Sequence, residues 1–105
     1  MHGTPDYIAP ESLTPEVAPD GRTDMYSLGA TAWHLLVGEP VFPGTSMQKI
    51  IKHSSAAPPD LAQRANVPEP LAGLIMACLS KSPLERPQAH EMLERLLASG
   101  LSRPA

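Results

Sequence analysis

Cysteine and long hydrophobic runs are scarce in this chain, and each scarcity excludes a class of protein. The single cysteine, Cys78, cannot form an intrachain disulfide, which excludes a disulfide-stapled secreted domain. The longest apolar runs, residues 28–37 and 71–79, are about half of the roughly 20 residues that a membrane-spanning helix needs. Residues 1–20 contain no apolar stretch typical of a signal peptide. We therefore expect a cytoplasmic protein with a buried free thiol.

The chain also has few basic residues and only a small net charge. Eight Lys and Arg residues against eleven Asp and Glu residues give a net charge of −3, and the basic residues are scattered singly. Without a basic stripe, we expect no nucleic-acid partner and no anionic membrane surface. The chain has four histidines, His2, His34, His53 and His90. Their spacing does not match that of metal ligands, so we predict no metal site.

Proline, in contrast, is abundant. The chain has 13 prolines in 105 residues, and they cluster between apolar segments. Because proline interrupts helices, this distribution predicts several short helices joined by tight loops. A content of 42% hydrophobic and 18% charged residues is typical of one small globular domain. No segment alternates polar and apolar residues as a strand does, and we predict an all-α fold.

The most apolar segment, residues 25–37, predicts the central helix. It is apolar almost all round, which is typical of a helix buried on every side. Thr23 or Asp24 would cap it after a turn at residues 20–21, and Gly38 would end it.

Three shorter helices and two helical turns are expected elsewhere. Apolar residues at spacings of three and four predict these helices, and flanking prolines and capping residues suggest their ends. The expected helices cover residues 47–53 after a cap at Ser46, residues 68–79, and residues 87–99. Single helical turns are expected near residues 10–13 and near Leu61.

Three motifs carry the most specific information. They are residues 3–11 (GTPDYIAPE), residues 24–29 (DMYSLG) and the Arg-Pro pair at 86–87. Together they resemble the second half of the catalytic domain of serine/threonine protein kinases, from the end of the activation segment to the last helix of the large lobe. The resemblance covers nearly the whole chain and implies a partial kinase large lobe. Tyrosine kinases place a different, Trp-containing sequence at the first motif.

This resemblance implies a substrate-docking loop at the start of the chain. Gly3, Thr4, Pro5 and Tyr7 would belong to the loop that cradles the substrate residue just after the phosphoacceptor. Thr4 would contact the catalytic Asp and its partner Lys, and neither of these residues is in this chain. Pro5 and Tyr7 would shape the pocket.

Two further positions resemble structural sites of the family. Glu11 and Arg86 are similar to the ion pair that ties the docking loop to the last helices. Asp24 is similar to the acidic residue that receives N–H groups of the catalytic loop at the start of the central helix. Without that loop, Asp24 would keep only a favourable charge at a helix N-terminus, worth typically about 0.3–1 kcal/mol. Positions that resemble the core of the large lobe are Tyr26, Leu28, Trp33 and Leu36.

The parts of a kinase that perform the chemistry are missing from this sequence. Phosphoryl transfer needs groups that position phosphates, hold metal ions and orient the nucleophile. Kinases take these from a Gly-rich loop, a strand Lys with its helix Glu, a His-Arg-Asp loop and an Asp-Phe-Gly motif, none of which occurs here. We therefore predict that this chain alone is inactive and binds neither ATP nor Mg²⁺, which the resemblance implies only for a complete domain.

We expect residues 1–105 to form one partial kinase domain, with a docking loop in residues 1–19 and a helical subdomain in residues 20–99. Three interpretations of such a chain remain open. The chain is a kinase segment whose partners are a protein substrate and the missing N-terminal part, a non-catalytic helical interaction module, or a gene remnant. A stand-alone module should carry polar residues on the outer face of residues 25–37, so their apolar character favours the first and third interpretations. The same face predicts self-association of the isolated chain.

Overall fold

The computed structural model describes residues 5–13 and 20–99, and every regular element within them is helical. The predicted all-α fold is confirmed, as are the helical turns near residues 10–13 and Leu61. The four α-helices are α1 (Gly21–Val37), α2 (Ser46–Ser55), α3 (Glu69–Cys78) and α4 (Ala89–Ser99). The four short 3-10 helices are η1 (Pro5–Tyr7), η2 (Pro10–Leu13), η3 (Leu61–Gln63) and η4 (Pro83–Glu85).

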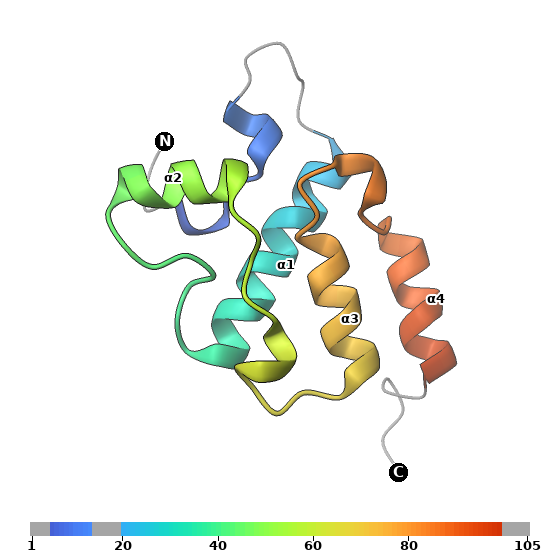
Figure 1. The fold of residues 1–105 in the computed structure, drawn as a ribbon. Coiled ribbons are helices and arrows are strands. Elements are labelled where there is room, and N and C mark those ends of the chain that lie inside the picture. The colour runs from blue at the N-terminus through green and yellow to red at the C-terminus, as the bar shows by residue number, and fades with distance from the viewer. Residues whose placement is uncertain (1–4, 14–19, 100–105) are drawn as a thin grey trace.

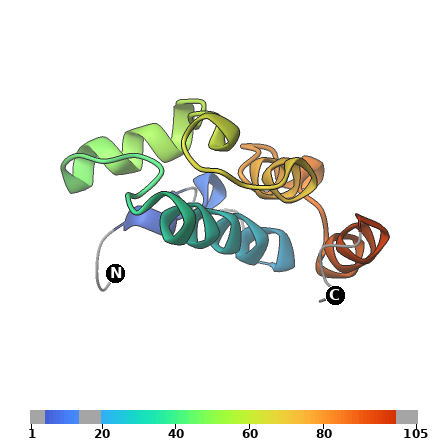
Figure 2. The same ribbon diagram turned by 90° about the horizontal axis from the view of Figure 1, so that it is seen from below.

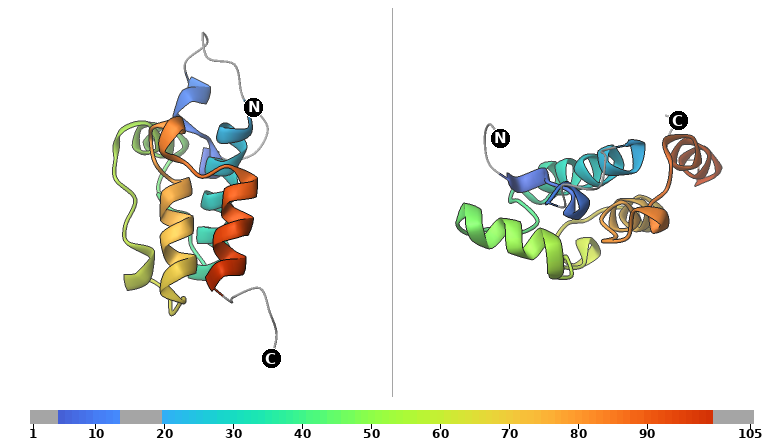
Figure 3. Two further views of the ribbon diagram at one scale, coloured as in Figure 1. Left: turned by 90° about the vertical axis from the view of Figure 1, so that its right-hand side faces the viewer. Right: turned by 90° about the horizontal axis from the view of Figure 1, so that it is seen from above.

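The helices form two layers, with α4 at one edge. One layer holds α1, and the other holds α2, η3 and α3, as Figure 2 and the right-hand view of Figure 3 show. α3 runs along α1, and α4 packs against α3 (Figure 1). η1 contacts both α1 and α2, so the start of the described chain lies where the two layers meet.

α1 begins at Gly21 instead of Met25, because Asp20 is its N-cap. The Asp20 carboxylate accepts hydrogen bonds from the backbone N–H of Arg22 at 2.9 Å and of Thr23 at 3.3 Å. The Thr23 hydroxyl accepts the Asp20 N–H in return, at 3.5 Å. The predicted cap at residues 23 or 24 and the predicted turn at 20–21 are therefore wrong, since this reciprocal capping box satisfies the free N–H groups one turn earlier.

Capping also decides where α2 and α4 begin. Thr45, and not Ser46, caps α2: its hydroxyl accepts the Gln48 N–H at 3.2 Å, and the Gln48 side-chain oxygen accepts the Thr45 N–H at 2.9 Å. The Gln88 N–H donates to the Glu91 carboxylate at 3.2 Å, as an N-cap residue does, and α4 accordingly starts after residue 88 and not at residue 87.

The core lies between α1 and the second layer. Its largest buried side chains are Tyr26, Trp33, Phe42, Leu61, Ile75 and Leu79. α1 and α3 approach so closely that a Cβ atom at Gly29 would lie 2.7 Å from the Cβ of Cys78. Cys78 is a buried free thiol, as predicted, and burial raises the pKa of this thiol.

One face of α1 is uncovered. Leu28 and Leu36, predicted as core, are 49% and 42% exposed, and Leu35 is 80% exposed. Leu28 and Leu35 are seven residues apart and therefore share a face of the helix. Other exposed apolar side chains lie on α2 and α4: Met47, Ile51, Leu93 and Leu97. Among the described residues, no helix combines the length and the hydropathy needed to cross a membrane.

Candidate functional site

The η1 segment is fixed by side chains from two helices that come later in the chain. The Tyr7 hydroxyl is hydrogen-bonded to Nδ1 of His34 at 2.8 Å, and the Tyr7 carbonyl accepts the Ser27 hydroxyl at 2.7 Å. Both partners come from α1. From α2, the Lys49 ammonium lies 2.6 Å from a carboxylate oxygen of Asp6, and both side chains are largely buried. The segment is therefore held on two sides, in one position relative to both helices.

Glu11 and Arg86 are 75 positions apart and form a two-pronged ion pair. Nη1 of Arg86 donates to Oε2 of Glu11 at 2.7 Å, and Nη2 donates to Oε1 at 2.9 Å. Two parallel bonds of this kind need the planar guanidinium group, which matches both carboxylate oxygens at once. The side chains are 0% and 9% exposed for Arg86 and Glu11. The structure thus brings together the two residues that the family resemblance pairs.

A third residue completes this site. The Thr23 hydroxyl donates to Oε2 of Glu11 at 2.7 Å. Burial would raise the pKa of Glu11, but the hydrogen bonds from Arg86 and Thr23 outweigh burial and lower the pKa to about 2. The carboxylate therefore stays ionised at neutral pH, and the pair remains charge-assisted.

Arg86 also connects α1 to the loop that precedes η4. Nε donates to the Ser80 carbonyl at 2.8 Å, Nη1 to the Arg22 carbonyl at 2.9 Å, and Nη2 to the Lys81 carbonyl at 3.4 Å. The guanidinium carbon lies 4.9 Å from the centre of the Tyr26 ring, within the range of a cation–π contact. Each of the three guanidinium nitrogens of Arg86 donates at least one hydrogen bond, which compensates for the burial of its charge.

The remaining predicted site residues have different positions. Gly3 and Thr4 lie outside the described residues. Pro5 is fully buried and Tyr7 is partly buried, both within η1. Asp24 lies in the first turn of α1 with its side chain exposed. The structure therefore gives Pro5 and Tyr7 a fixed position and leaves Asp24 at a helix N-terminus.

Sequence reasoning missed the residues that anchor the η1 segment and Glu11. Thr23, Ser27 and His34 are polar residues of the mostly apolar helix α1, and they bond to Glu11 or Tyr7. Their spacing of four and seven places them on one face of α1, which is the signal that could have identified them. No comparable pattern indicates Lys49.

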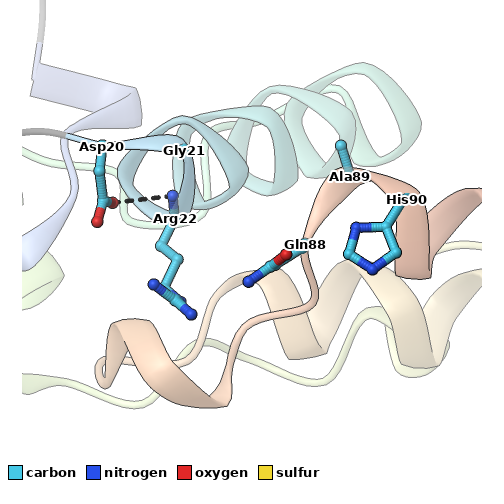
Figure 4. A pocket seen from close by; sticks show the side chains of 6 residues that line it. All are labelled: Asp20, Gly21, Arg22, Gln88, Ala89 and His90. Atoms are coloured by element: carbon cyan, nitrogen blue, oxygen red, sulfur yellow. Dashed lines mark hydrogen bonds between the residues drawn. The ribbon is translucent and has the colours of Figure 1, made fainter.

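A hollow of about 540 Å³ lies between the start of α1 and the start of α4 (Figure 4). It is lined by Asp20, Gly21, Arg22, Gln88, Ala89 and His90. Its one carboxylate is already engaged as the cap of α1. Within residues 5–13 and 20–99, no group of three His, Cys, Asp or Glu side chains could hold a metal ion. The hollow itself therefore offers no free carboxylate to a metal ion.

Comparison with known proteins gives consistent matches along the chain. Residues 1–97 match the model of the protein kinase domain. The chain is 41% identical over 87 residues to the serine/threonine-protein kinase PknF of Mycobacterium tuberculosis, covering 82% of this chain and 18% of that protein.

Two further relatives show the same pattern. The chain is 37% identical over 103 residues to the serine/threonine-protein kinase PkaA of Streptomyces coelicolor, covering 94% of this chain and 18% of that protein. It is 36% identical over 98 residues to the serine/threonine-protein kinase A of Synechocystis, covering 90% and 19%. The chain thus spans less than a fifth of the length of these relatives.

Proposed function

Since this chain belongs to the serine/threonine protein kinase family, we propose that it supplies the substrate-docking side of a domain that phosphorylates protein serine or threonine residues. The fixed position of the η1 segment between α1 and α2 carries this proposal. Phosphoryl transfer depends on holding the acceptor in place, so a docking loop is useful only when its own position is fixed.

Each predicted site residue has a role in this proposal. Pro5 and Tyr7 shape the pocket for the substrate residue after the phosphoacceptor, together with Gly3 and Thr4. Their support is the Glu11–Arg86 pair, which ties the end of the docking loop to the loop after α3. Asp24 contributes negative charge at the start of α1.

The same proposal makes this chain inactive on its own. The motifs that hold phosphates and metal in kinases do not occur in this sequence, so these groups would come from the missing N-terminal part of the kinase domain. We propose that this part and a protein substrate are the partners of the chain, in the cytoplasm, and that nucleic acid is not a partner. The buried free thiol of Cys78 suits a reducing compartment.

The uncovered face of α1 supports the kinase segment over a stand-alone interaction module. Leu28 and Leu35 share this face and are 49% and 80% exposed. A module that works alone would need polar side chains here, because exposed apolar surface on a soluble domain favours association. In a complete domain, the N-terminal part would cover these residues.

We expect the isolated chain to self-associate through this face of α1. Leu35→Glu should shift the purified chain toward monomer, because it places a charge in the apolar contact. Sedimentation velocity over a range of concentrations measures the shift. Leu84→Glu is the matched control, since Leu84 is equally exposed, at 79%, but lies on η4. A wild-type chain that is monomeric and unfolds cooperatively would favour the interaction module instead.

A further inference from the structure

The helix α2 keeps much of its apolar surface exposed. Met47 and Ile51 are four residues apart on one face of this helix, and they are 66% and 55% exposed. The side chain that α2 does bury is the polar His53. The helix lies at the opposite edge of the fold from α4 and packs mainly against η1 and η2 (Figure 1). Because apolar burial is the main stabilising contribution to packing, α2 depends largely on polar contacts for its position.

The contact between α2 and η1 includes an ion pair that is almost closed to solvent. The Lys49 ammonium nitrogen lies 2.6 Å from Oδ1 of Asp6, and the two side chains are 13% and 9% exposed. Lys49 and His53 are four residues apart and share the inner face of α2. His53, however, bonds to the Tyr26 hydroxyl of α1, at 2.7 Å. Lys49 is therefore the residue that links the charge of α2 directly to η1.

The neighbours of Asp6 restrict how η1 can respond to the loss of this pair. A buried carboxylate that loses its cation keeps its desolvation penalty, which favours contact with water. Pro5 is fully buried on one side of Asp6. Tyr7, on the other side, is bonded to His34 and Ser27 of α1. The carboxylate therefore regains water by separation of η1 from α2, while η1 keeps its bonds to α1.

We propose that Lys49 is a positioning residue, through which α2 sets the position of η1. The inference rests on the proposed function, in which Pro5 and Tyr7 of η1 shape the pocket for the substrate. Because the exposed apolar face of α2 does not anchor the helix, one ion pair decides whether η1 and α2 stay together. Substrate docking then depends on α2, although this helix carries none of the predicted site residues.

The test compares two buried thiols, one in the docking loop and one in the core. Ala9→Cys introduces a thiol two residues after Tyr7, at a position that is 1% exposed. Cys78 of α3 is fully buried and reports opening of the core. Both thiols are labelled with iodoacetamide in the full chain, and peptide mass spectrometry follows each rate. We expect Lys49→Met to raise the rate at position 9 at least about tenfold and the rate at Cys78 less than about threefold.

Two further variants show whether the ion pair is responsible. Lys52→Met is the matched control, because Lys52 lies on the same helix with its side chain exposed, and it should change neither rate. Asp6→Asn removes the other half of the pair. Combined with Lys49→Met, it should raise the rate at position 9 no further, because the contact is already broken.

Hydrogen exchange gives the same comparison without an added thiol. The Ser12 amide donates to the Ala9 carbonyl at 3.0 Å, so its exchange reports on the docking loop, and the amides of α3 report on the core. The proposal is overturned if Lys49→Met leaves the docking loop unchanged, or if loop and core open by the same factor. Multiplying effects of Lys49→Met and Asp6→Asn would also overturn it. None of these outcomes depends on phosphorylation, so the proposed function is tested separately.

Discussion

Arg86→Leu is expected to lower the free energy of unfolding by about 3–5 kcal/mol. The substitution leaves the Glu11 carboxylate, which is only 9% exposed, without both of its guanidinium bonds. It also removes the donors to the Ser80 and Arg22 carbonyls. A buried charge without its partner retains its full desolvation penalty, which is why the loss exceeds the net worth of the pair. Urea unfolding at neutral pH measures the change.

Two variants make this result specific to the geometry. Arg64→Leu removes an arginine from an exposed pair with Glu39, in which the charged groups are 3.9 Å apart, and should change stability by about 0.5 kcal/mol or less. Arg86→Lys keeps the charge but cannot form two parallel bonds to Glu11, so it should remain strongly destabilised. If Arg86→Leu lowered the free energy of unfolding by less than about 1 kcal/mol, a buried pair that stabilises the fold would be contradicted.

Acid titration gives the same pair a second signature. The folded-state pKa of Glu11 is about 2, below its ordinary value of 4.5. The unfolded chain therefore binds this proton first as the pH falls, and the stabilisation is present above about 4.5 and lost as the pH falls through about 2. In Arg86→Leu most of this acid dependence should disappear, because the Arg86 bonds contribute the largest lowering of the pKa of Glu11.

Acidification from about pH 6.5 to 4 is expected to remove about 3 kcal/mol of stability through His53 alone. His53 is fully buried, and its ring meets the edges or faces of Tyr26 and Phe42 at centroid distances of 5.6 Å and 4.9 Å. The Tyr26 hydroxyl lies 2.7 Å from Nδ1. A neutral His53 accepts the Tyr26 hydrogen at Nδ1, while the Tyr26 oxygen accepts a hydrogen bond from the Lys81 ammonium.

The direction of this pH effect follows from the folded-state pKa. Burial, followed by the charge of Lys81, lowers the pKa of His53 to about 4. Asp6 has a smaller raising effect on this pKa, and Lys49 lowers it slightly further. Between about pH 4 and 6.5 the unfolded state holds more protons than the folded state, so stability falls as the pH falls. The loss is complete below about 4.

His53→Asn tests this prediction, because the amide oxygen can accept the Tyr26 hydrogen but does not titrate. The free energy of unfolding is measured by urea titration at several values between about pH 7 and 4. The wild-type chain should lose about 3 kcal/mol more over this range than the variant. Equal pH slopes in the two proteins would show that the imidazole is not held neutral by its surroundings.

The family motifs predicted the ion pair, and local chemistry predicted some helix ends. Glu11 and Arg86 each lie within a motif of the family, so the resemblance could pair them across 75 positions. Gly38 could be predicted as the end of α1, because its φ of 87° suits glycine and few other residues. The start of α1 could not, since Asp20-Gly21 is typical of both a turn and a cap, and only the Thr23 contact distinguishes them.

Long-range polar contacts account for most of what the sequence did not reveal. The bond between Tyr7 and His34 joins residues 27 positions apart, and neither residue type implies the other. The ion pair between Asp6 and Lys49 similarly depends on how α2 packs against η1. Periodicity shows which apolar residues share a helix face, but it cannot show that Leu28 is 49% exposed in the folded chain.

The central claim is that this chain is one part of a larger kinase domain, and the intact mass of the native polypeptide tests it most directly. An antibody raised to residues 84–99 would capture the protein from its source cells for mass spectrometry. The account predicts a species much larger than 11.2 kDa, in which the η1 segment and the Glu11–Arg86 pair have their family roles. A single species of 11.2 kDa would contradict it.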